Sequence, residues 1–303
     1  MSGGPVFIGG LDRTGKTPMR IAIEAHAPIA ISRRAELWTH HRRGNGRLAD
    51  DGRARRAVED LLKDPHVAKL VGHPERLLRD FLDGPRTDAE LFALVGRQHA
   101  ELAGRARWGD QTALIERHAP EILNAYSGAR FVHMIRDPRD RFAEALASGG
   151  VGPGGAGAAI ERWLESVALA ERHSAAWPDR YLVVRYEDLA LQPHTTLRRV
   201  LEFIGEPVAQ GAGVASADVL AGTIGMHRSL TRRTTALFET YCSAAMRRHG
   251  YEPTATPLTT AERMSMALLD RPVAAATSAA LRLGAGLASR WRGNGSPLSA
   301  ERR

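Results

Sequence analysis

The segment Gly10–Thr17, GLDRTGKT, constrains this chain more than any other part of its sequence. It satisfies the phosphate-loop pattern G-x-x-x-x-G-K-[ST]. An apolar run, Pro5–Ile8, precedes it, and a helical spacing of apolar residues over Lys16–His26 follows it. Glycines let backbone N–H groups surround an anion, and the amino end of a helix adds about half a positive charge. The segment therefore predicts a phosphate site, with a ligand-free turn as the other interpretation.

Further patterns predict an α/β fold with a central parallel sheet. The runs Arg130–Ile135 and Tyr181–Val184 are apolar on both faces, as expected for strands covered by helices on each side. A helix is predicted to begin after Asp137, which caps it, with Pro138 in its first position and Asp140 in its first turn. Strands that alternate with helices, without hairpin turns, favour parallel pairing.

The chain is expected to hold one large domain and a tail. The domain covers 1–270 and includes a helical insert at about 35–105, with helices broken at Pro65, Pro74 and Gly84-Pro85. Residues 271–303 are rich in Ala, Ser, Gly and Arg, so we expect a frayed tail or an amphipathic helix with weak membrane-surface contact. The segment 149–157 is too rich in glycine for regular structure and is a candidate mobile lid.

Composition excludes several classes of protein. The single cysteine, Cys242, excludes a disulfide framework and fits a reducing, cytoplasmic location. No run of about 18 apolar residues predicts a membrane span, and the first ten residues lack a signal-peptide pattern. The net charge of +8 favours anionic partners. The arginines of 33–56 form either a solvated arm or a basic rim that attracts an anion. The sequence contains no recognition helix or aromatic RNA motif that would indicate a nucleic-acid partner.

A second anion site is predicted at Arg136, which ends an apolar strand where a helix begins. Two anion sites on parallel strands suit a nucleotide phosphorylated at both ends. The alternative is an ion pair of Arg136 with Asp140 or Glu187. A P-loop small-molecule kinase also stays open, because Lys16 and Thr17 match the ATP-type loop, although such an enzyme needs an acid that holds magnesium.

At this point the sequence resembles the bacterial sulfotransferases, which use 3′-phosphoadenosine 5′-phosphosulfate (PAPS) and share a P-loop-type three-layer α/β/α fold. The resemblance covers about 5–253. It rests on these segments in this order: VFIGGLDRTGKTPMRIAIEAHAPIAIS, WGDQT, ARFVHMIRDPRDRF, RYLVVRYEDLALQPHTTLRRVLEFIGEP and IGMHRSLTRRTTALFETYCSAAMRRHGYEP. It implies transfer of a sulfuryl group from PAPS to a hydroxyl or amine of a small-molecule, glycan or lipid acceptor, without a metal ion.

The resemblance also implies roles for individual residues. In the loop, Arg13 takes the place of the basic residue that contacts the transferring group, and Thr17 matches a hydroxyl donor to the 5′-phosphate. Arg136 matches the arginine that holds the 3′-phosphate. The predicted donor-binding set is Arg13, Thr14, Gly15, Lys16, Thr17, Arg136, Ser148 and Arg228.

The sequence departs from the family pattern at two places. Glu144 stands where a serine usually follows Arg136 by eight residues; Ser148 comes four residues later, and Arg228 is a candidate substitute. Gln111 replaces the lysine of a WGDKT-like segment, which removes one cation.

The chemistry of the transfer requires cations and a base. Negative charge grows on the bridging oxygen as the S–O bond breaks, so Arg13 and Lys16 are predicted to stabilise it. A base that takes the proton of the acceptor helps by about 10²–10⁴ in rate. Glu36 is the first candidate, followed by Asp110 and His26. Each also has a structural interpretation, as an ion-pair partner, a helix cap and a hydrogen-bonded helix end respectively.

Overall fold

The structure is a computed structural model whose contacts divide the chain into two compact units. The first unit holds Met1–Arg136 and Glu165–Ile224, and the second holds Asp137–Leu164 and Gly225–Arg303. The structure describes residues 3–43, 48, 50–151, 155–208, 214, 217–255, 258–265 and 268. The expected tail, 271–303, lies outside these described residues, so its separation from a domain over 1–270 stays a prediction.

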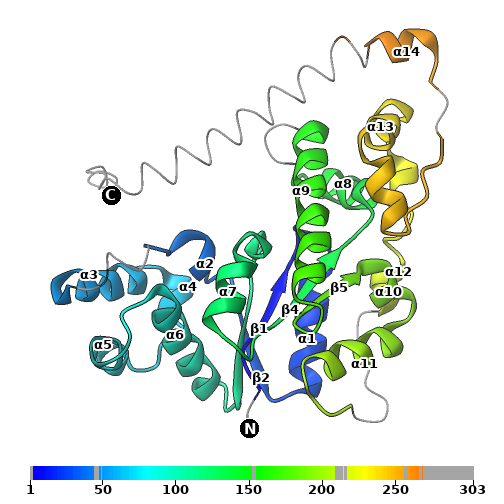
Figure 1. Ribbon diagram of the computed structural model, residues 1–303. Coiled ribbons are helices and arrows are strands. Elements are labelled where there is room, and N and C mark those ends of the chain that lie inside the picture. Colours follow the sequence, from blue (N-terminus) through cyan, green and yellow to red (C-terminus); the bar gives the residue numbers. More distant parts are fainter. Residues whose placement is uncertain are drawn as a thin grey trace. The chain divides into compact units, whose positions relative to one another are not determined.

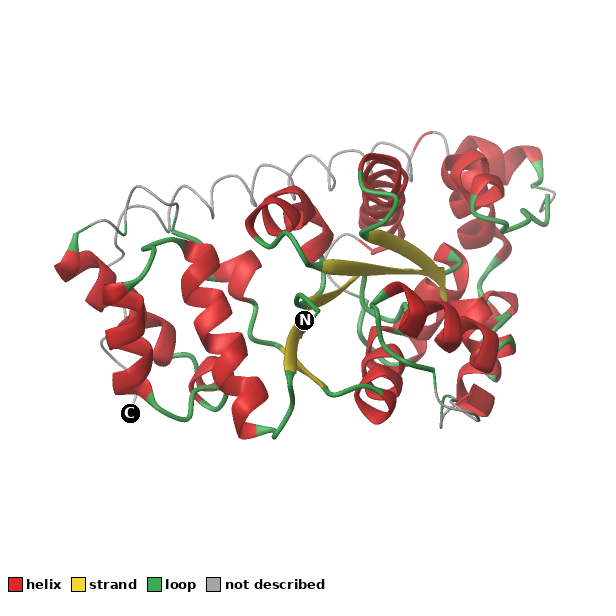
Figure 2. Cartoon of the chain, turned by 60° about the horizontal axis from the view of Figure 1, so that its bottom comes forward, coloured by secondary structure: helices red, strands yellow, loops and turns green. Residues whose placement is uncertain are grey.

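The first unit contains a five-stranded sheet in which every neighbouring pair is parallel (Figures 1 and 2). The order across the sheet is β2-β3-β1-β4-β5, so β1 is central. In register, Val6 pairs with Gly109 on one side and Arg130 on the other. The strands are β1 (Val6–Gly9), β2 (Ile29–Arg33), β3 (Arg107–Gln111), β4 (Arg130–Ile135) and β5 (Tyr181–Arg185).

Helices cover both faces of this sheet, and alternate residues along each strand supply two separate cores. In β1, Phe7 packs into one apolar cluster, whereas Val6 and Ile8 pack into the other. The Phe7 cluster joins the sheet to α2 (Leu37–His40), α3 (Asp51–Leu62), α4 (Pro65–Ala68), α5 (Pro74–Asp83), α6 (Asp88–Leu102), η2 (Ile115–His118) and α7 (Ala119–Ala125). The Val6 cluster joins it to α1 (Lys16–His26), α10 (Tyr186–Leu191), α11 (Pro193–Phe203) and α12 (Ala217–Ala221). The predicted three-layer α/β/α fold is confirmed.

The helical insert between β2 and β3 is also confirmed. Pro65 and Pro74 stand in the first turns of α4 and α5, where the missing N–H of proline costs no hydrogen bond. Gly84 ends α5. The breaks predicted from proline and glycine thus fall at helix boundaries.

The regular elements described in the second unit are all helices. This unit contains α8 (Pro138–Ala147), η3 (Met226–Ser229), α13 (Arg232–Arg248) and α14 (Thr260–Ser265). Helix α9 (Gly155–Ala176) gives residues to both units. Within the second unit, the rings of Phe142 and Phe238 pack with centroids 5.2 Å apart. Asp137 caps α8 by accepting a hydrogen bond from the N–H of Arg139, as the sequence predicted.

The structure differs from the sequence-based prediction in two places. Strands β2 and β3 were not predicted, because β3 reads RWGDQ, whose arginine, glycine and aspartate give no apolar alternation. The segment 149–157 was expected to be irregular, yet Gly155–Gly157 form the first turn of α9. Residues 152–154 of that segment lie outside the described residues, so its role as a lid stays a prediction.

Candidate active site

The predicted site residues of the first unit gather where the parallel strands end. Parallel strands place their carboxyl ends at one edge of a sheet, here called the carboxyl edge, and ligands of open α/β sheets bind there. The phosphate loop follows β1, and the segment Arg34–Glu36 follows β2. Asp110 is the last residue but one of β3, and Arg136 follows β4 directly.

The backbone of the phosphate loop requires its glycines. Gly10 and Gly15 have φ angles of +113° and +88°. A Cβ atom on Gly10 would lie 2.2 Å from the carbonyl oxygen of Met134, and one on Gly15 would lie 2.8 Å from the ring of Tyr186. Any side chain at either position would force the loop to move.

Cations hold the carbonyl oxygens of the loop. Lys16 is buried, with 6% of the residue exposed. Its Nζ donates to the carbonyl oxygens of Gly10 and Leu11 at 2.9 and 2.5 Å. Nη1 of Arg136 donates to the carbonyl oxygen of Arg13 at 2.9 Å. Carbonyl oxygens repel an anion and N–H groups attract it. Because these oxygens are held by protein cations, the loop is shaped to present N–H groups to an anion.

The amino end of α1 adds to this preference for an anion. Gly15 is its N-cap residue, without a side-chain cap, and the first turn holds no acidic residue. The first N–H groups of such a helix have no intrahelical partner. The Thr17 hydroxyl is exposed and accepts a hydrogen bond from Nε2 of Gln111 at 3.4 Å. Thr14 is buried, and its hydroxyl donates to the carbonyl oxygen of Leu11 at 2.7 Å.

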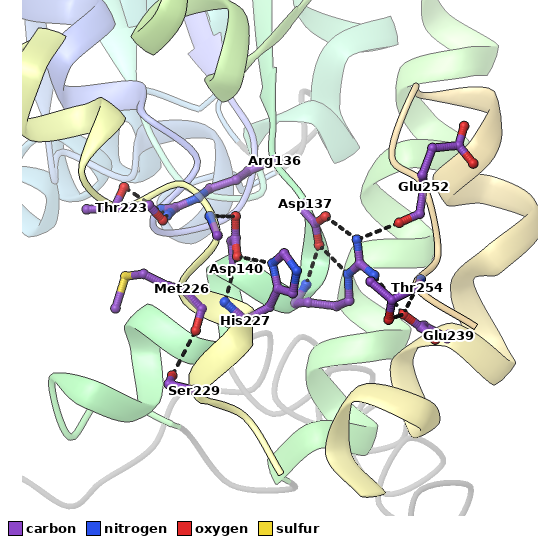
Figure 3. A network of polar contacts seen from close by, with 12 residues as sticks. Arg136, Asp137, Asp140, Thr223, Met226, His227, Ser229, Glu239, Glu252 and Thr254 are labelled. Atoms are coloured by element: carbon purple, nitrogen blue, oxygen red, sulfur yellow. Dashed lines mark hydrogen bonds and ion pairs between the residues drawn. The ribbon is translucent and has the colours of Figure 1, made fainter. Parts of the chain in front are cut away.

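Arg136 lies buried at the end of β4. Its guanidinium carbon is 4.0 Å from the centroid of the Tyr186 ring. Nη2 donates to both the carbonyl and the hydroxyl oxygen of Thr223, each at 3.0 Å (Figure 3). Arg136 therefore ties the phosphate loop to the segment around Thr223. Its contact with a 3′-phosphate stays a prediction.

Two predicted donor-binding residues belong to the second unit. Ser148 follows the last turn of α8, and its hydroxyl donates to the carbonyl oxygen of Glu144 at 2.6 Å. Since α8 has 10 residues, Ser148 lies about 15 Å from the beginning of that helix. Arg228 is exposed on η3. Their roles in binding the donor stay predictions.

Asp140 fixes the turn that carries Arg228. Its carboxylate accepts hydrogen bonds from the N–H of Gly225 and the N–H of His227, both at 2.8 Å, and contacts Nδ1 of His227 at 2.6 Å (Figure 3). Burial disfavours its charge, but the His227 side chain and the two N–H groups lower the pKa of Asp140 below its usual value. Asp140 thus has a structural role in the second unit.

Two candidate bases lie at the carboxyl edge. Glu36 precedes α2, is about half exposed, and pairs with Nδ1 of His40 at 2.5 Å. Asp110 is 1% exposed, and its carboxylate accepts hydrogen bonds from Ser32 at 2.8 Å and Thr112 at 3.2 Å. Burial raises the pKa of Asp110 to about 6, and the negative charge of Glu36 adds to the increase. The charge of Glu36 therefore affects how easily Asp110 loses its proton.

The third candidate base lies elsewhere. His26 is the last residue of α1, whereas the phosphate loop precedes the first. Eleven residues of helix separate these ends by about 16 Å. His26 lies toward the opposite edge of the sheet, just before β2 begins.

Backbone strain is concentrated at the carboxyl edge. Among the residues that the structure describes, the non-glycine residues with positive φ are Arg13, Arg34, Glu36, Leu114 and Ala255. The first four lie in the segments that follow β1, β2 and β3. Such conformations cost of order 1 kcal/mol each and are frequent at functional sites. Two of the proposed catalytic residues, Arg13 and Glu36, are among them.

The family of this chain follows from a comparison with models of known protein families. Residues 5–210, more than half of the chain, match the model described as "Sulfotransferase family". The chain belongs to the sulfotransferase family. The resemblance inferred from the sequence is thereby confirmed at the level of the family, and the sulfotransferase match includes the phosphate loop, Glu36, Asp110 and Arg136.

Several solved sulfotransferase structures are similar to the chain. The sulfotransferase domain of the Synechococcus PCC 7002 olefin synthase is 19% identical, with 76% of this chain and 90% of that one covered and a TM-score of 0.49. A Mycobacterium avium sulfotransferase is 15% identical, covering 82% and 77%, with a TM-score of 0.44. An Alicyclobacillus acidocaldarius sulfotransferase is also 15% identical, covering 87% and 100%, with a TM-score of 0.44. No curated protein matches the sequence.

Neither a metal cluster nor a membrane span was found within the described parts of this sulfotransferase. No group of three or more His, Cys, Asp or Glu residues there could hold a metal ion. No helix there is long and apolar enough to cross a membrane.

Sequence reasoning missed three residues that shape the site. Tyr186 supports both Gly15 and Arg136, and Thr223 accepts hydrogen bonds from Arg136. Glu116 accepts a hydrogen bond from the N–H of Gly10. Tyr186 stood within a quoted segment, two residues after a predicted strand, and could have been found from that position. Thr223 and Glu116 carry no local signal, because only the fold brings them to the loop.

Proposed function

We propose that this sulfotransferase moves a sulfuryl group from PAPS to a hydroxyl or amine of a small-molecule, glycan or lipid acceptor. Family membership supports the sulfuryl transfer. The observation that carries the choice of donor is the phosphate loop, whose carbonyl oxygens are held by Lys16 and Arg136. That arrangement favours an anion over the loop, with a second cation one strand away. Family membership gives no support to the alternative of a kinase.

The donor is proposed to lie along the carboxyl edge from β1 toward β4. Its 5′-phosphosulfate would occupy the loop, close to Arg13, Lys16 and Thr17. Neighbouring strands are about 4.8 Å apart, so Arg136 at the end of β4 is within reach of the 3′-phosphate of the same nucleotide. The acceptor would then approach from the side of β3 and β2, where Asp110 and Glu36 lie.

The proposed reaction is a direct displacement at sulfur. The acceptor oxygen or nitrogen forms a bond to sulfur while the bond between sulfur and the bridging oxygen breaks. The electron pair of that bond stays on the bridging oxygen, so 3′-phosphoadenosine 5′-phosphate (PAP) leaves with the additional negative charge. Arg13 and Lys16 stabilise this charge. The carboxylate of Glu36 takes the proton that the acceptor loses. The protein cations supply the charge neutralisation, so we expect transfer without a metal ion.

The test is a donor titration followed by a transfer assay. Calorimetric titration with PAP and PAPS, with and without a chelator, should show one saturable site that does not require metal. ATP with Mg²⁺ should bind more weakly, because it lacks a 3′-phosphate. Transfer of labelled sulfate from PAPS would then be measured with a panel of hydroxyl and amine acceptors. Binding of ATP–Mg²⁺ in preference to PAPS would reject the proposed donor.

A further inference from the structure

A buried carboxylate lies directly behind the phosphate loop. Glu116, in η2, is 0% exposed, and its Oε2 accepts a hydrogen bond from the N–H of Gly10 at 2.9 Å. The contact is tightly packed, because a Cβ atom on Gly9 would lie 3.1 Å from the same oxygen. The reaction proposed above gives this carboxylate no role.

Glu116 is held in place by other elements of the first unit. Its Oε1 accepts a hydrogen bond from the Ser166 hydroxyl at 2.9 Å. The same hydroxyl lies 2.9 Å from Nε2 of His133, whose Nδ1 lies 2.7 Å from the Tyr181 hydroxyl. Nε2 of His173 lies 3.1 Å from the carbonyl oxygen of Glu116. Residues of β4, β5 and α9 thus fix both the side chain and the backbone of Glu116.

A carboxylate is a costly group at this position. Taking it out of water is unfavourable, and its charge opposes an anion bound on the loop. A neutral acceptor would be enough to satisfy a single backbone N–H. A carboxylate, however, accepts a stronger hydrogen bond than a neutral group does. Firm orientation of the Gly10 N–H is therefore what this arrangement supplies.

Gly10 is the first residue of the loop, and both of its backbone polar groups are held. Glu116 holds its N–H, and Lys16 holds its carbonyl oxygen at 2.9 Å. The φ angle of +113° between them turns the chain sharply into the loop. The direction in which the later N–H groups of the loop point follows from this turn. The N–H of Gly10 itself is committed to the protein.

We propose that Glu116 is a positioning residue for the donor site of this sulfotransferase. It orients the Gly9–Gly10 peptide so that the N–H groups after Gly10 converge on the 5′-phosphosulfate. This proposal rests on the proposed donor. It implies that the N–H of Gly10 makes no contact with the donor, and that the loop has its binding shape before the donor arrives.

The test compares two substitutions of similar size. Glu116→Gln keeps an oxygen acceptor for Gly10, whereas Glu116→Met removes it. We expect the dissociation constant of PAP to rise at least about tenfold in Glu116→Met and at most about threefold in Glu116→Gln, since a tenfold change matches one hydrogen bond of ordinary strength. By NMR, amide exchange of Gly10 should accelerate in the Met variant alone. Gln98→Ala is the stability control. Gln98 is buried in α6 of the first unit and makes hydrogen bonds to the backbone of His73 rather than to Glu116, so this variant should have a lower melting temperature and an unchanged dissociation constant.

Three outcomes would overturn the positioning role. They are equal affinity of the Met and Gln variants for PAP, unchanged exchange of Gly10 in the Met variant, or a loss of affinity in Gln98→Ala as large as in Glu116→Met. If the Met variant does not fold, amide exchange of Gly10 is measured in the wild-type protein instead. The Gly10 amide must be protected from exchange both with and without PAP, and protection that requires PAP rejects the proposal. If wild-type protein does not bind PAP, the proposed donor is wrong, while Gly10 exchange still tests the contact with Glu116.

Discussion

Arg136 donates a hydrogen bond from Nη1 to the carbonyl oxygen of Arg13, 2.9 Å away. The residue expected to hold one end of the donor therefore also supports the loop that is expected to hold the other end. A substitution of Arg136 changes both a charge and a loop. Experiments on these arginines must separate the two effects.

Replacing Arg13 should abolish transfer and leave the fold intact. Loss of a group that stabilises the departing oxygen costs about 10²–10³ in rate. Arg13 has a φ angle of +65°, which glycine adopts without strain. We therefore expect Arg13→Gly to lose activity as Arg13→Ala does, with a melting temperature no lower than that of the wild type. Turnover assays with labelled PAPS and thermal unfolding would measure both, and near-normal turnover in either variant would exclude the role.

Arg136→Ala should weaken PAPS more than adenosine 5′-phosphosulfate. Only PAPS has a 3′-phosphate, and a hydrogen bond to a charged group contributes about 1.5–3 kcal/mol, or roughly 10–100-fold in affinity. Competition titrations with both donors measure the difference. If Arg136 acts only by holding the Arg13 carbonyl, the two affinities will fall by the same factor.

Arg139 supplies the matched control for this experiment. It lies three residues after Arg136, and in the second unit it pairs with Asp137 at 2.8 Å and Glu239 at 2.7 Å. Arg139→Ala leaves two buried carboxylates without this partner, which costs about 3–5 kcal/mol of stability. We expect it to lower the melting temperature without changing the ratio of the two donor affinities.

Asp110→Asn should change how stability depends on pH. Burial raises the pKa of Asp110 from 3.8 to about 6 in the folded protein. Between about pH 4 and 6 the folded state therefore binds more protons at this site than the unfolded state, and stability falls as the pH rises through that window. The contribution is up to about 3 kcal/mol. Urea unfolding across this range should show a shallower fall for Asp110→Asn, and Asp83→Asn, on an exposed residue, should behave as the wild type does.

Glu36→Gln should lower kcat and leave donor binding unchanged. The loss expected for a proton acceptor is about 10²–10⁴ in rate. His40→Ala removes the partner of Glu36 but keeps the carboxylate, so it should retain most of the activity. The measurement is kcat for an acceptor that the wild type uses, together with the dissociation constant of PAP. A large loss in Asp110→Asn, with normal turnover in Glu36→Gln, would move the base to Asp110.

Much of the fold could be predicted from local patterns. The phosphate loop between an apolar run and a helical pattern predicted β1 and α1, and the capping pattern after Asp137 predicted the beginning of α8. Strands β2 and β3 were missed. In β3, Asp110 is buried, and its carboxylate accepts hydrogen bonds from Thr112 nearby in the chain and from Ser32, which is 78 residues away. A buried polar residue whose partner is as distant in the sequence as Ser32 is cannot be distinguished in sequence from an exposed one.

The sequence by itself determined the phosphate loop and the parallel α/β fold, because glycine geometry, helix capping and apolar periodicity act over a few residues. The sulfotransferase family followed from the resemblance of longer segments. The tertiary structure decided how the loop is held. Glu116 and Arg136 are 106 and 123 residues away from the loop residues that they bind. Only the parallel order of the strands brings their side chains to one edge, where hydrogen bonds between such distant residues can form.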